Sequence, residues 1–317
     1  MGTLRRLLSR LVVTTALLLG GLALTGAPAA QAAQPSPQAG ETTTICGYTP
    51  VPSGWVIISE QPAGCSGYGL FTITQITTET TIRACGNSPI PNGWVITAWV
   101  NNAGCGLYPL YTLLKITDQT TLQACGHSAI PDGWVITAMA NNAGCDVYPL
   151  YTLLKITNQT TIQDCGHSAI PNGWVITSIQ PGAQCGSYGV YTVVKLTTET
   201  TIRACGNSAI PDGWVITAMA NNAGCGAYPL YTLLKITDQT TIQDCGQSAI
   251  PNGWVIVSTQ QGSQCGVYTV YTIVKITTQT RMQICGHSAI PAGWVITNQQ
   301  AGSQCGVYTV YTIEKRA

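Results

Sequence analysis

The stretch TTIRACGNSPIPNGWVITAWVNNAGCGLYPLYTLLKITDQ, residues 80–119, contains the signals from which the fold can be predicted. Related stretches follow one another at a period of forty residues, and self-similarity at a fixed period is the signature of a repeat protein. We number the copies as units 1 to 7. They span residues 41–79, 80–119, 120–159, 160–199, 200–239, 240–279 and 280–317.

Each unit has the composition of a small β-sheet. In unit 2 the residues of Thr80–Ala84, Gly93–Ala98 and Tyr108–Ile116 are rich in Thr, Val, Ile, Tyr and Trp, with apolar residues alternating with polar ones. The segment Pro91-Asn92-Gly93 is typical of a turn, because proline sets one backbone angle and glycine accepts a positive φ. We therefore predict an all-β fold with three strands per unit and no helix.

Two cysteines occur in every unit, at matching positions. The first members are Cys46, Cys85, Cys125, Cys165, Cys205, Cys245 and Cys285, and the second are Cys65, Cys105, Cys145, Cys185, Cys225, Cys265 and Cys305. A unit of this size cannot bury a sufficient core alone and usually needs a staple. Pairing within the unit closes a loop of about twenty residues, worth roughly 3 kcal/mol. We favour that pairing, while bridges between adjacent units stay open because spacing alone does not fix connectivity.

Three arrangements of the units are compatible with the repeat: independent beads, a linear stack and a closed ring. A propeller blade typically has four strands, and we count three. The nearly constant spacing favours a linear stack in which each unit contacts its neighbours.

The N-terminus resembles an export signal. Basic residues precede an apolar segment over 11–24, and Ala30-Gln31-Ala32 provides small residues for cleavage, so we predict a signal peptide over 1–33 and a leader over 34–40. We expect a secreted, extracellular protein without membrane insertion, in a compartment where disulfides form. Only 8% of the residues are charged and the net charge is +1, so we expect no nucleic-acid partner.

No set of residues with catalytic spacing recurs. His127, His167 and His287 occupy a position that holds other residue types elsewhere, and we interpret them as solvated turn residues. The neighbouring serine lies in C-G-x-S, which is not a nucleophile elbow. Asp132 and Asp212 occupy a turn position that is also filled by Asn. We expect no catalytic residue, no metal site, no cofactor and no enzymatic activity.

The aromatic residues divide between core and surface. One tryptophan per unit, such as Trp94, is expected to fill the core. The tyrosine pair of unit 2, Tyr108 and Tyr111, is spaced so that at least one member should be exposed or lie against a neighbouring unit. The recurring lysine near the end of the third strand, such as Lys115, we interpret as protection of a sheet edge.

The stretch before the second cysteine varies most, and loops held by a rigid scaffold often carry binding. Our candidate ligand contacts are Asn101, Asn102, Tyr111, Asn141, Asn142, Tyr151, Asn221, Asn222 and Tyr231. The first hypothesis is a multivalent adhesion or scaffold protein at an extracellular or bacterial surface, with glycans, cell-wall polymer, other proteins or further copies of itself as partners. The alternatives are a carbohydrate-binding lectin and a secreted protease inhibitor or toxin-associated protein.

Overall fold

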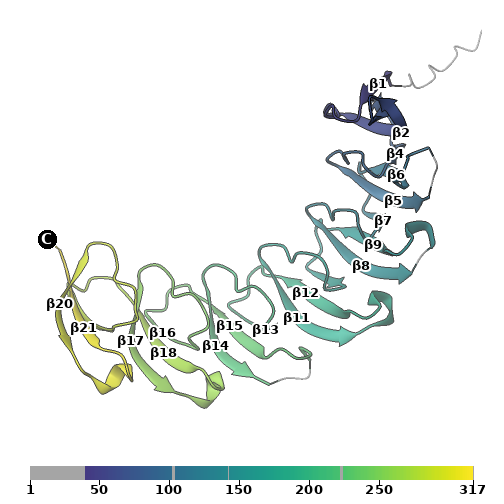
Figure 1. Ribbon diagram of the computed structural model, residues 1–317. Helices are drawn as coiled ribbons and strands as arrows, with labels where there is room; N and C mark the ends of the chain where they lie inside the picture. The colour runs from purple at the N-terminus through teal and green to yellow at the C-terminus, as the bar shows by residue number, and fades with distance from the viewer. Residues whose placement is uncertain (1–39, 102–103, 142, 222–223, 317) are drawn as a thin grey trace, which may run out of the picture. The chain divides into compact units, whose positions relative to one another are not determined.

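The computed structural model describes residues 40–101, 104–141, 143–221 and 224–316. Within them every unit forms its own three-stranded antiparallel sheet, and the sheets follow one another in sequence order (Figure 1). The all-β class and the count of three strands per unit are confirmed. The sheets remain separate and build an open stack, because no sheet combines strands of two units.

The three strands of a unit are called a, b and c in chain order. The a strands are β1 (Thr42–Cys46), β4 (Thr81–Cys85), β7 (Thr121–Cys125), β10 (Thr161–Asp164), β13 (Thr201–Cys205), β16 (Thr241–Asp244) and β19 (Arg281–Cys285). The b strands are β2 (Trp55–Cys65), β5 (Trp94–Val100), β8 (Trp134–Asn141), β11 (Trp174–Pro181), β14 (Trp214–Ala220), β17 (Trp254–Gln261) and β20 (Trp294–Gln300). The c strands are β3 (Tyr68–Gln75), β6 (Leu110–Lys115), β9 (Pro149–Lys155), β12 (Gly189–Lys195), β15 (Leu230–Lys235), β18 (Thr269–Lys275) and β21 (Val310–Lys315).

Among the described residues, short 3-10 segments end at the second cysteine in four units, although the sequence favours helix nowhere. They are η1 (Ala143–Cys145), η2 (Ala183–Cys185), η3 (Ser263–Cys265) and η4 (Ser303–Cys305). Single turns of this kind are common connectors and do not change the fold class. No helix in the part of the chain that is described is long and apolar enough to cross a membrane.

Strand c lies in the middle of every sheet, between a and b. In unit 2 the c residue Lys115 is paired with Trp94 of the b strand, and its N–H donates to Thr80 O at 2.8 Å. The interpretation of the recurring lysine as edge protection is therefore wrong, because the lysine lies on a central strand. The edges are formed by strands a and b.

A bulge interrupts every b strand at the same place. In unit 2 the register with strand c shifts between Ile96 and Ala98, so that Thr97 is the extra residue. Thr97 Oγ1 donates to Thr112 O at 3.2 Å, across to strand c. Bulges bend and twist an edge strand, which makes it a poor template for unwanted pairing.

Each disulfide joins the two cysteines of one unit, as predicted. All seven pairs have Cα separations between 5.1 and 5.6 Å. The bond ties the end of strand a to the turn before strand c, and the sequence separation of 19 or 20 residues matches the loop expected from the spacing. No described cysteine is free.

The hydrophobic core lies between units as much as within them. One cluster combines Val135 of unit 3, Trp174 and Ile176 of unit 4, and the Cys205–Cys225 disulfide of unit 5. Equivalent clusters recur along the stack. The tryptophan is a core residue, as expected, but the disulfide it meets belongs to the next unit. The staple within each unit thus explains only part of the stability of that unit, because residues of neighbouring units complete its core.

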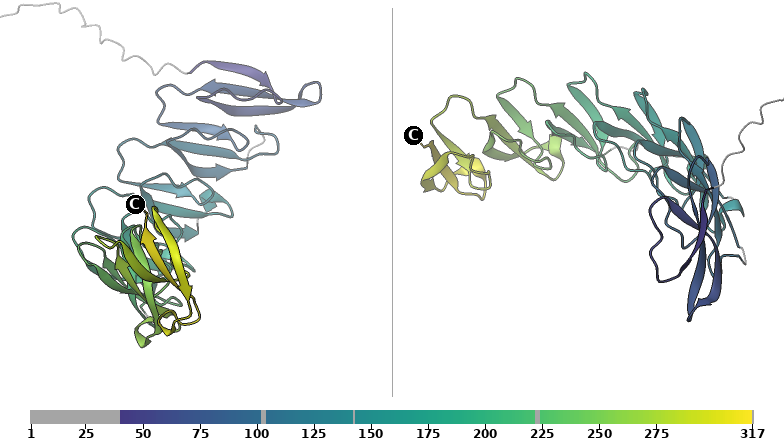
Figure 2. Two further views of the ribbon diagram at one scale, coloured as in Figure 1. Left: turned by 90° about the vertical axis from the view of Figure 1, so that its left-hand side faces the viewer. Right: turned by 90° about the horizontal axis from the view of Figure 1, so that it is seen from above.

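Hydrogen bonds also cross every junction. An isoleucine N–H of strand b donates to the hydroxyl oxygen of the serine in the C-G-x-S segment of the following unit. The pairs are Ile57 and Ser88, Ile96 and Ser128, Ile136 and Ser168, Ile176 and Ser208, Ile216 and Ser248, and Ile256 and Ser288, at 2.8 to 3.1 Å. Two further views show each sheet beside those of its neighbours in the sequence (Figure 2). The units form a stack and are not independent beads.

Candidate binding grooves between the units

A tight turn follows the second cysteine and presents a tyrosine to solvent. In unit 4 the turn runs from Cys185 to Tyr188, closed by a bond from Tyr188 N to Cys185 O at 3.1 Å. Gly186 has φ 62 and ψ −123, the angles of the first central position in a type II′ turn. A side chain is strained at that position, which explains the glycine of the C-G-x-Y pattern.

The turn tyrosine is exposed in all seven units, whereas most large side chains around it are buried. These tyrosines are Tyr68, Tyr108, Tyr148, Tyr188, Tyr228, Tyr268 and Tyr308, with 38 to 58% of their surface accessible. The residue before them is also apolar and highly exposed in several units, as at Leu107, Val147, Val267 and Val307. Such side chains are costly to leave in water, so a recurring set of them indicates a contact surface.

One groove with this geometry lies between units 5 and 6. It has a volume of about 750 Å³ and is lined by Met219 at the end of β14, by Asn221 just after that strand, by η3, and by the two turn tyrosines Tyr228 and Tyr268. No charged residue contributes to its walls. Mostly apolar walls with a few polar groups are typical of ligand sites.

A smaller groove occurs at the corresponding place between units 2 and 3. Its volume is about 220 Å³, and it is lined by Trp99, Val100, Asn101 and Asp146. Unit 7 has a hollow of about 320 Å³ along the same turn, from Ala301 to Thr309. Concave surfaces therefore recur in several units, where the end of strand b lies beside the tyrosine turn.

A second tyrosine lies behind the turn tyrosine of the next unit. Burial raises the pKa of Tyr231, and the neighbouring Tyr268 adds to the increase. The same two causes, in the same order, raise the pKa of Tyr111, Tyr151, Tyr191 and Tyr271. Each of these strand c tyrosines therefore lies near enough to a turn tyrosine of the next unit to be affected by its charge.

The histidines pack among these tyrosines, and our interpretation of them as solvated is wrong for His127 and His287, which are half-buried. His127 is half-buried, with ring centroids 5.1 Å from Tyr111 and 4.6 Å from Tyr148. Burial lowers the pKa of His127 and of His287. Only His167 is exposed, and it also packs on a turn tyrosine, Tyr188, at 4.2 Å.

The residue at the histidine position is matched to the strand b residue across the junction. Trp99 of unit 2 meets His127 of unit 3 with ring centroids 5.1 Å apart. Between units 1 and 2 the same two positions hold Glu60 and Asn87, and Asn87 Nδ2 donates to Glu60 Oε2 at 3.2 Å. At these two junctions the variable position therefore contacts the strand b residue of the preceding unit.

The candidate contacts from the sequence divide into three groups. Asn101, Asn141 and Asn221 are exposed at the ends of strands b, and the first and last of them line grooves. Asn102, Asn142 and Asn222 lie outside the described residues. Tyr111 and Tyr231 are half-buried and Tyr151 is buried, so they are less accessible than the turn tyrosines. The exposed members of the pairs, Tyr108, Tyr148 and Tyr228, were not on our candidate list.

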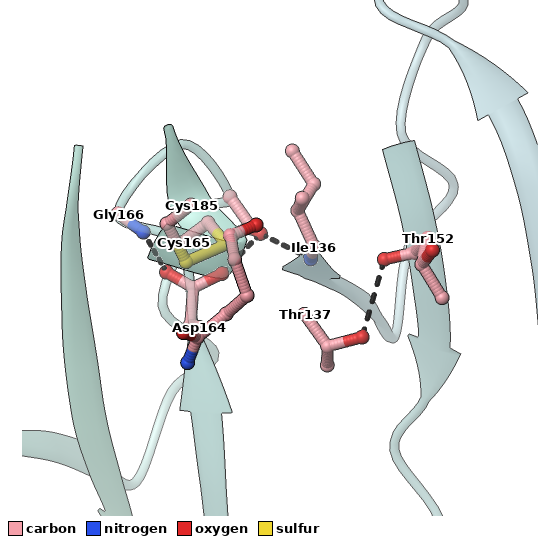
Figure 3. The surroundings of a disulfide bond; sticks show 9 residues. Ile136, Thr137, Thr152, Asp164, Cys165, Gly166 and Cys185 are labelled. Atoms are coloured by element: carbon pink, nitrogen blue, oxygen red, sulfur yellow. Dashed lines mark hydrogen bonds between the residues drawn. A yellow bond between two sulfur atoms is a disulfide. The ribbon is translucent and has the colours of Figure 1, made fainter. Parts of the chain in front are cut away.

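Two buried carboxylates were missed by the sequence reasoning. Asp164 and Asp244 stand immediately before the first cysteine, where the other units have alanine or isoleucine, and both are fully buried. Gly166 N donates to Asp164 Oδ2 at 2.8 Å, beside the Cys165–Cys185 disulfide (Figure 3). The Ser168 hydroxyl donates to the same carboxylate.

These carboxylates also stabilise the contact with the preceding unit. Burial raises the pKa of Asp164 above its ordinary value of 3.8, while the hydrogen bonds from Ser168 and Gly166 act in the opposite direction. Cys165 N donates to Ile136 O at 2.8 Å, next to the bond from Ile136 N to Ser168 Oγ (Figure 3). The Ser168 oxygen thus takes part in two hydrogen bonds, so this serine has a structural role.

Comparison with known proteins identified no relative: no family model, no curated protein sequence and no solved structure matches the chain.

Proposed function

We propose that the chain is an extracellular adhesion or scaffold protein that binds a repetitive partner through several inter-unit grooves at once. The observation that carries the proposal is the exposed tyrosine at the same turn of all seven units. A single groove of this kind offers little contact area, but several that engage together raise the overall affinity without requiring any strong site.

The disulfides support an extracellular location. Each described unit is stapled once, and disulfides persist where the environment is oxidising. Each unit is crosslinked internally, and buried serine hydroxyls join it to the unit before. The turns are therefore held by a rigid scaffold. Such a scaffold reduces the ordering cost that binding loops otherwise incur.

A graded tyrosine series tests the proposal. The mature protein would be tested for retention on chitin, cellulose, peptidoglycan sacculi and gelatin. Variants would carry serine at one, three or all seven of the turn tyrosines 68, 108, 148, 188, 228, 268 and 308. We expect a small effect of one substitution and a steep loss with seven, because avidity depends on the number of sites that engage.

The matched control uses exposed positions at the other end of strand b. Serine at Asn92, Asp132 and Asn172 changes exposed turn residues away from the tyrosine turns. We expect this control to bind like the wild type. Retention that survives all seven tyrosine changes, or a wild-type protein that is retained on none of the four surfaces, would contradict the proposal.

The lectin hypothesis remains a second candidate for the same grooves. The observation that favours it is the lack of charge around the groove between units 5 and 6, where tyrosine rings, an asparagine amide and a serine provide the polar groups. Neutral polysaccharides, which combine apolar ring faces with hydroxyl groups, suit such walls better than charged polymers do.

A further inference from the structure

We propose that the groove between units 2 and 3 binds one neutral sugar ring, with Asp146, Asn101 and Trp99 as its contacts. This inference rests on the proposed function, since it assigns a ligand class to one of the grooves. The groove measures about 220 Å³, below the roughly 300–1,000 Å³ of sites for drug-sized ligands, so it has room for a single ring.

The backbone of Asp146 is the first argument. Asp146 has φ 56, in the left-handed region, at a turn position where unit 1 has Ser66 with φ 51 and the five other units have glycine. Those glycines, Gly106, Gly186, Gly226, Gly266 and Gly306, have φ between 61 and 63. A non-glycine residue there costs about 1–2 kcal/mol. Strained residues of this kind occur preferentially at binding sites, so the outlier indicates a use for the side chain.

The chemistry of the three side chains is the second argument. The carboxylate of Asp146 accepts hydrogen bonds, and bonds from hydroxyl groups to an ionised acceptor are stronger than neutral ones. The amide of Asn101 both donates and accepts. Trp99 provides an apolar aromatic surface. A sugar ring offers the complementary set, namely adjacent hydroxyl groups and an apolar face of C–H groups.

The charge around the groove argues against a cation as the ligand. Asp146 is exposed, and an ion pair between exposed groups contributes only about 0–1 kcal/mol. His127 lies against Trp99, and burial lowers its pKa, which favours the neutral form of its ring. One solvated carboxylate beside neutral groups favours a neutral ligand rich in hydroxyls.

The chain contains its own control for this site. Units 3 and 5 are nearly identical in sequence, but Gly226 stands in unit 5 where unit 3 has Asp146. The residue facing unit 5 from the preceding strand b is Ile179, in the place of Trp99. The junction between units 4 and 5 therefore lacks both the carboxylate and the indole, and we expect no sugar site there.

The test is a titration of the mature protein with glucose, galactose, mannose and N-acetylglucosamine, followed by NMR or calorimetry. We expect binding of at least one of these sugars, weakened at least tenfold in D146G. Because glycine relieves the turn, D146G should also unfold at a higher temperature, which separates loss of the site from misfolding. The control G186D, at the same turn position of unit 4, should bind sugar with the affinity of the wild type.

Two outcomes would overturn the inference: D146G that binds sugar as the wild type does, and a wild-type protein that binds methylammonium but none of the four sugars. Both are distinguishable from failure of the proposed function. Retention on a surface that depends on the turn tyrosines but not on Asp146 would leave the multivalent array intact. Loss of sugar binding in D146G without any tyrosine dependence on surfaces would support the sugar site alone.

Discussion

The backbone N–H of Ile176 in unit 4 donates to the hydroxyl oxygen of Ser208 in unit 5 at 3.1 Å, inside the junction between the two sheets. Strand b is a sheet edge, so this N–H has no partner within its own unit. Burying it without one would cost free energy, and the serine of the next unit removes that cost. The C-G-x-S pattern thus encodes attachment to the preceding unit.

Ser208→Ala should therefore weaken the junction between units 4 and 5. An unsatisfied buried N–H costs about 1–3 kcal/mol, so we expect a lower midpoint in urea and faster hydrogen exchange of the peptide containing Ile176. Ser187→Ala, in the exposed turn of unit 4, is the control and should change stability by less than about 0.5 kcal/mol. Equal effects of the two substitutions would show that the bond contributes nothing.

Asp146→Gly should stabilise unit 3 by about 1 kcal/mol, because it removes a side chain from the left-handed region. Thermal unfolding followed by circular dichroism would measure the gain. The reverse change, Gly226→Ala at φ 62 in unit 5, should lower the midpoint by a similar amount. A neutral or negative effect of D146G would mean that the aspartate side chain compensates for the strain within the free protein.

The two buried aspartates make stability depend on pH. Burial raises the pKa of Asp164 and of Asp244 in the folded protein above the ordinary value of 3.8. Their contribution to the free energy of unfolding is therefore fully present below the pKa of the unfolded state. It is lost as the pH rises through the higher pKa of the folded state. The variant D164N/D244N does not lose stability in this way. The melting temperature of the variant minus that of the wild type should therefore be larger at pH 7 than at pH 4.

Glu79 and Glu199 act in the opposite direction. Hydrogen bonds from Thr77 lower the pKa of Glu79, and those from Thr197 lower the pKa of Glu199, so these exposed groups lose their contribution on acidification. For this reason the aspartate effect must be measured as a difference between variant and wild type. A difference that is the same at both pH values would contradict it.

The disulfides should differ in what they contribute. Cys205 and Cys225 are completely buried in a cluster with Trp174 and Ile176 of the preceding unit, whereas Cys46 and Cys65 of unit 1 are only half-buried. Both bonds close loops of similar length, of 20 and 19 residues, so the entropic part of roughly 3 kcal/mol is shared.

Serine at both cysteines should therefore cost more in unit 5 than in unit 1, by about 1 kcal/mol or more from lost packing. Urea unfolding, with peptide-resolved hydrogen exchange to locate the loss, would measure it. In the unit 5 variant we expect faster exchange in unit 4 as well, because the sulfurs pack under its strand b. A loss confined to unit 5 would show that the sulfurs act only as a crosslink.

The sequence by itself determined the local structure of this protein. Alternation of Thr, Val, Ile and Tyr predicts the strands, Pro-x-Gly predicts the turn before Trp94, and two cysteines per period of forty residues predict the staple. These features depend on contacts within one unit, where each residue type has a strong conformational preference. The half-buried histidines, the strand c tyrosines near the turn tyrosines and the buried Asp164 escaped prediction, because their surroundings come from the neighbouring unit.

Only the tertiary structure decided the order of the strands and the relation between units. It places strand c, with Lys115, in the middle of the sheet, and it covers each disulfide after the first with the strand b of the unit before. It also separates the exposed Tyr148 from the buried Tyr151, although both follow the same motif. The physical reason is that the hydrophobic effect is not directional. The repeat therefore predicts which residues are buried, but only the stacking of two sheets determines which residues they are buried against.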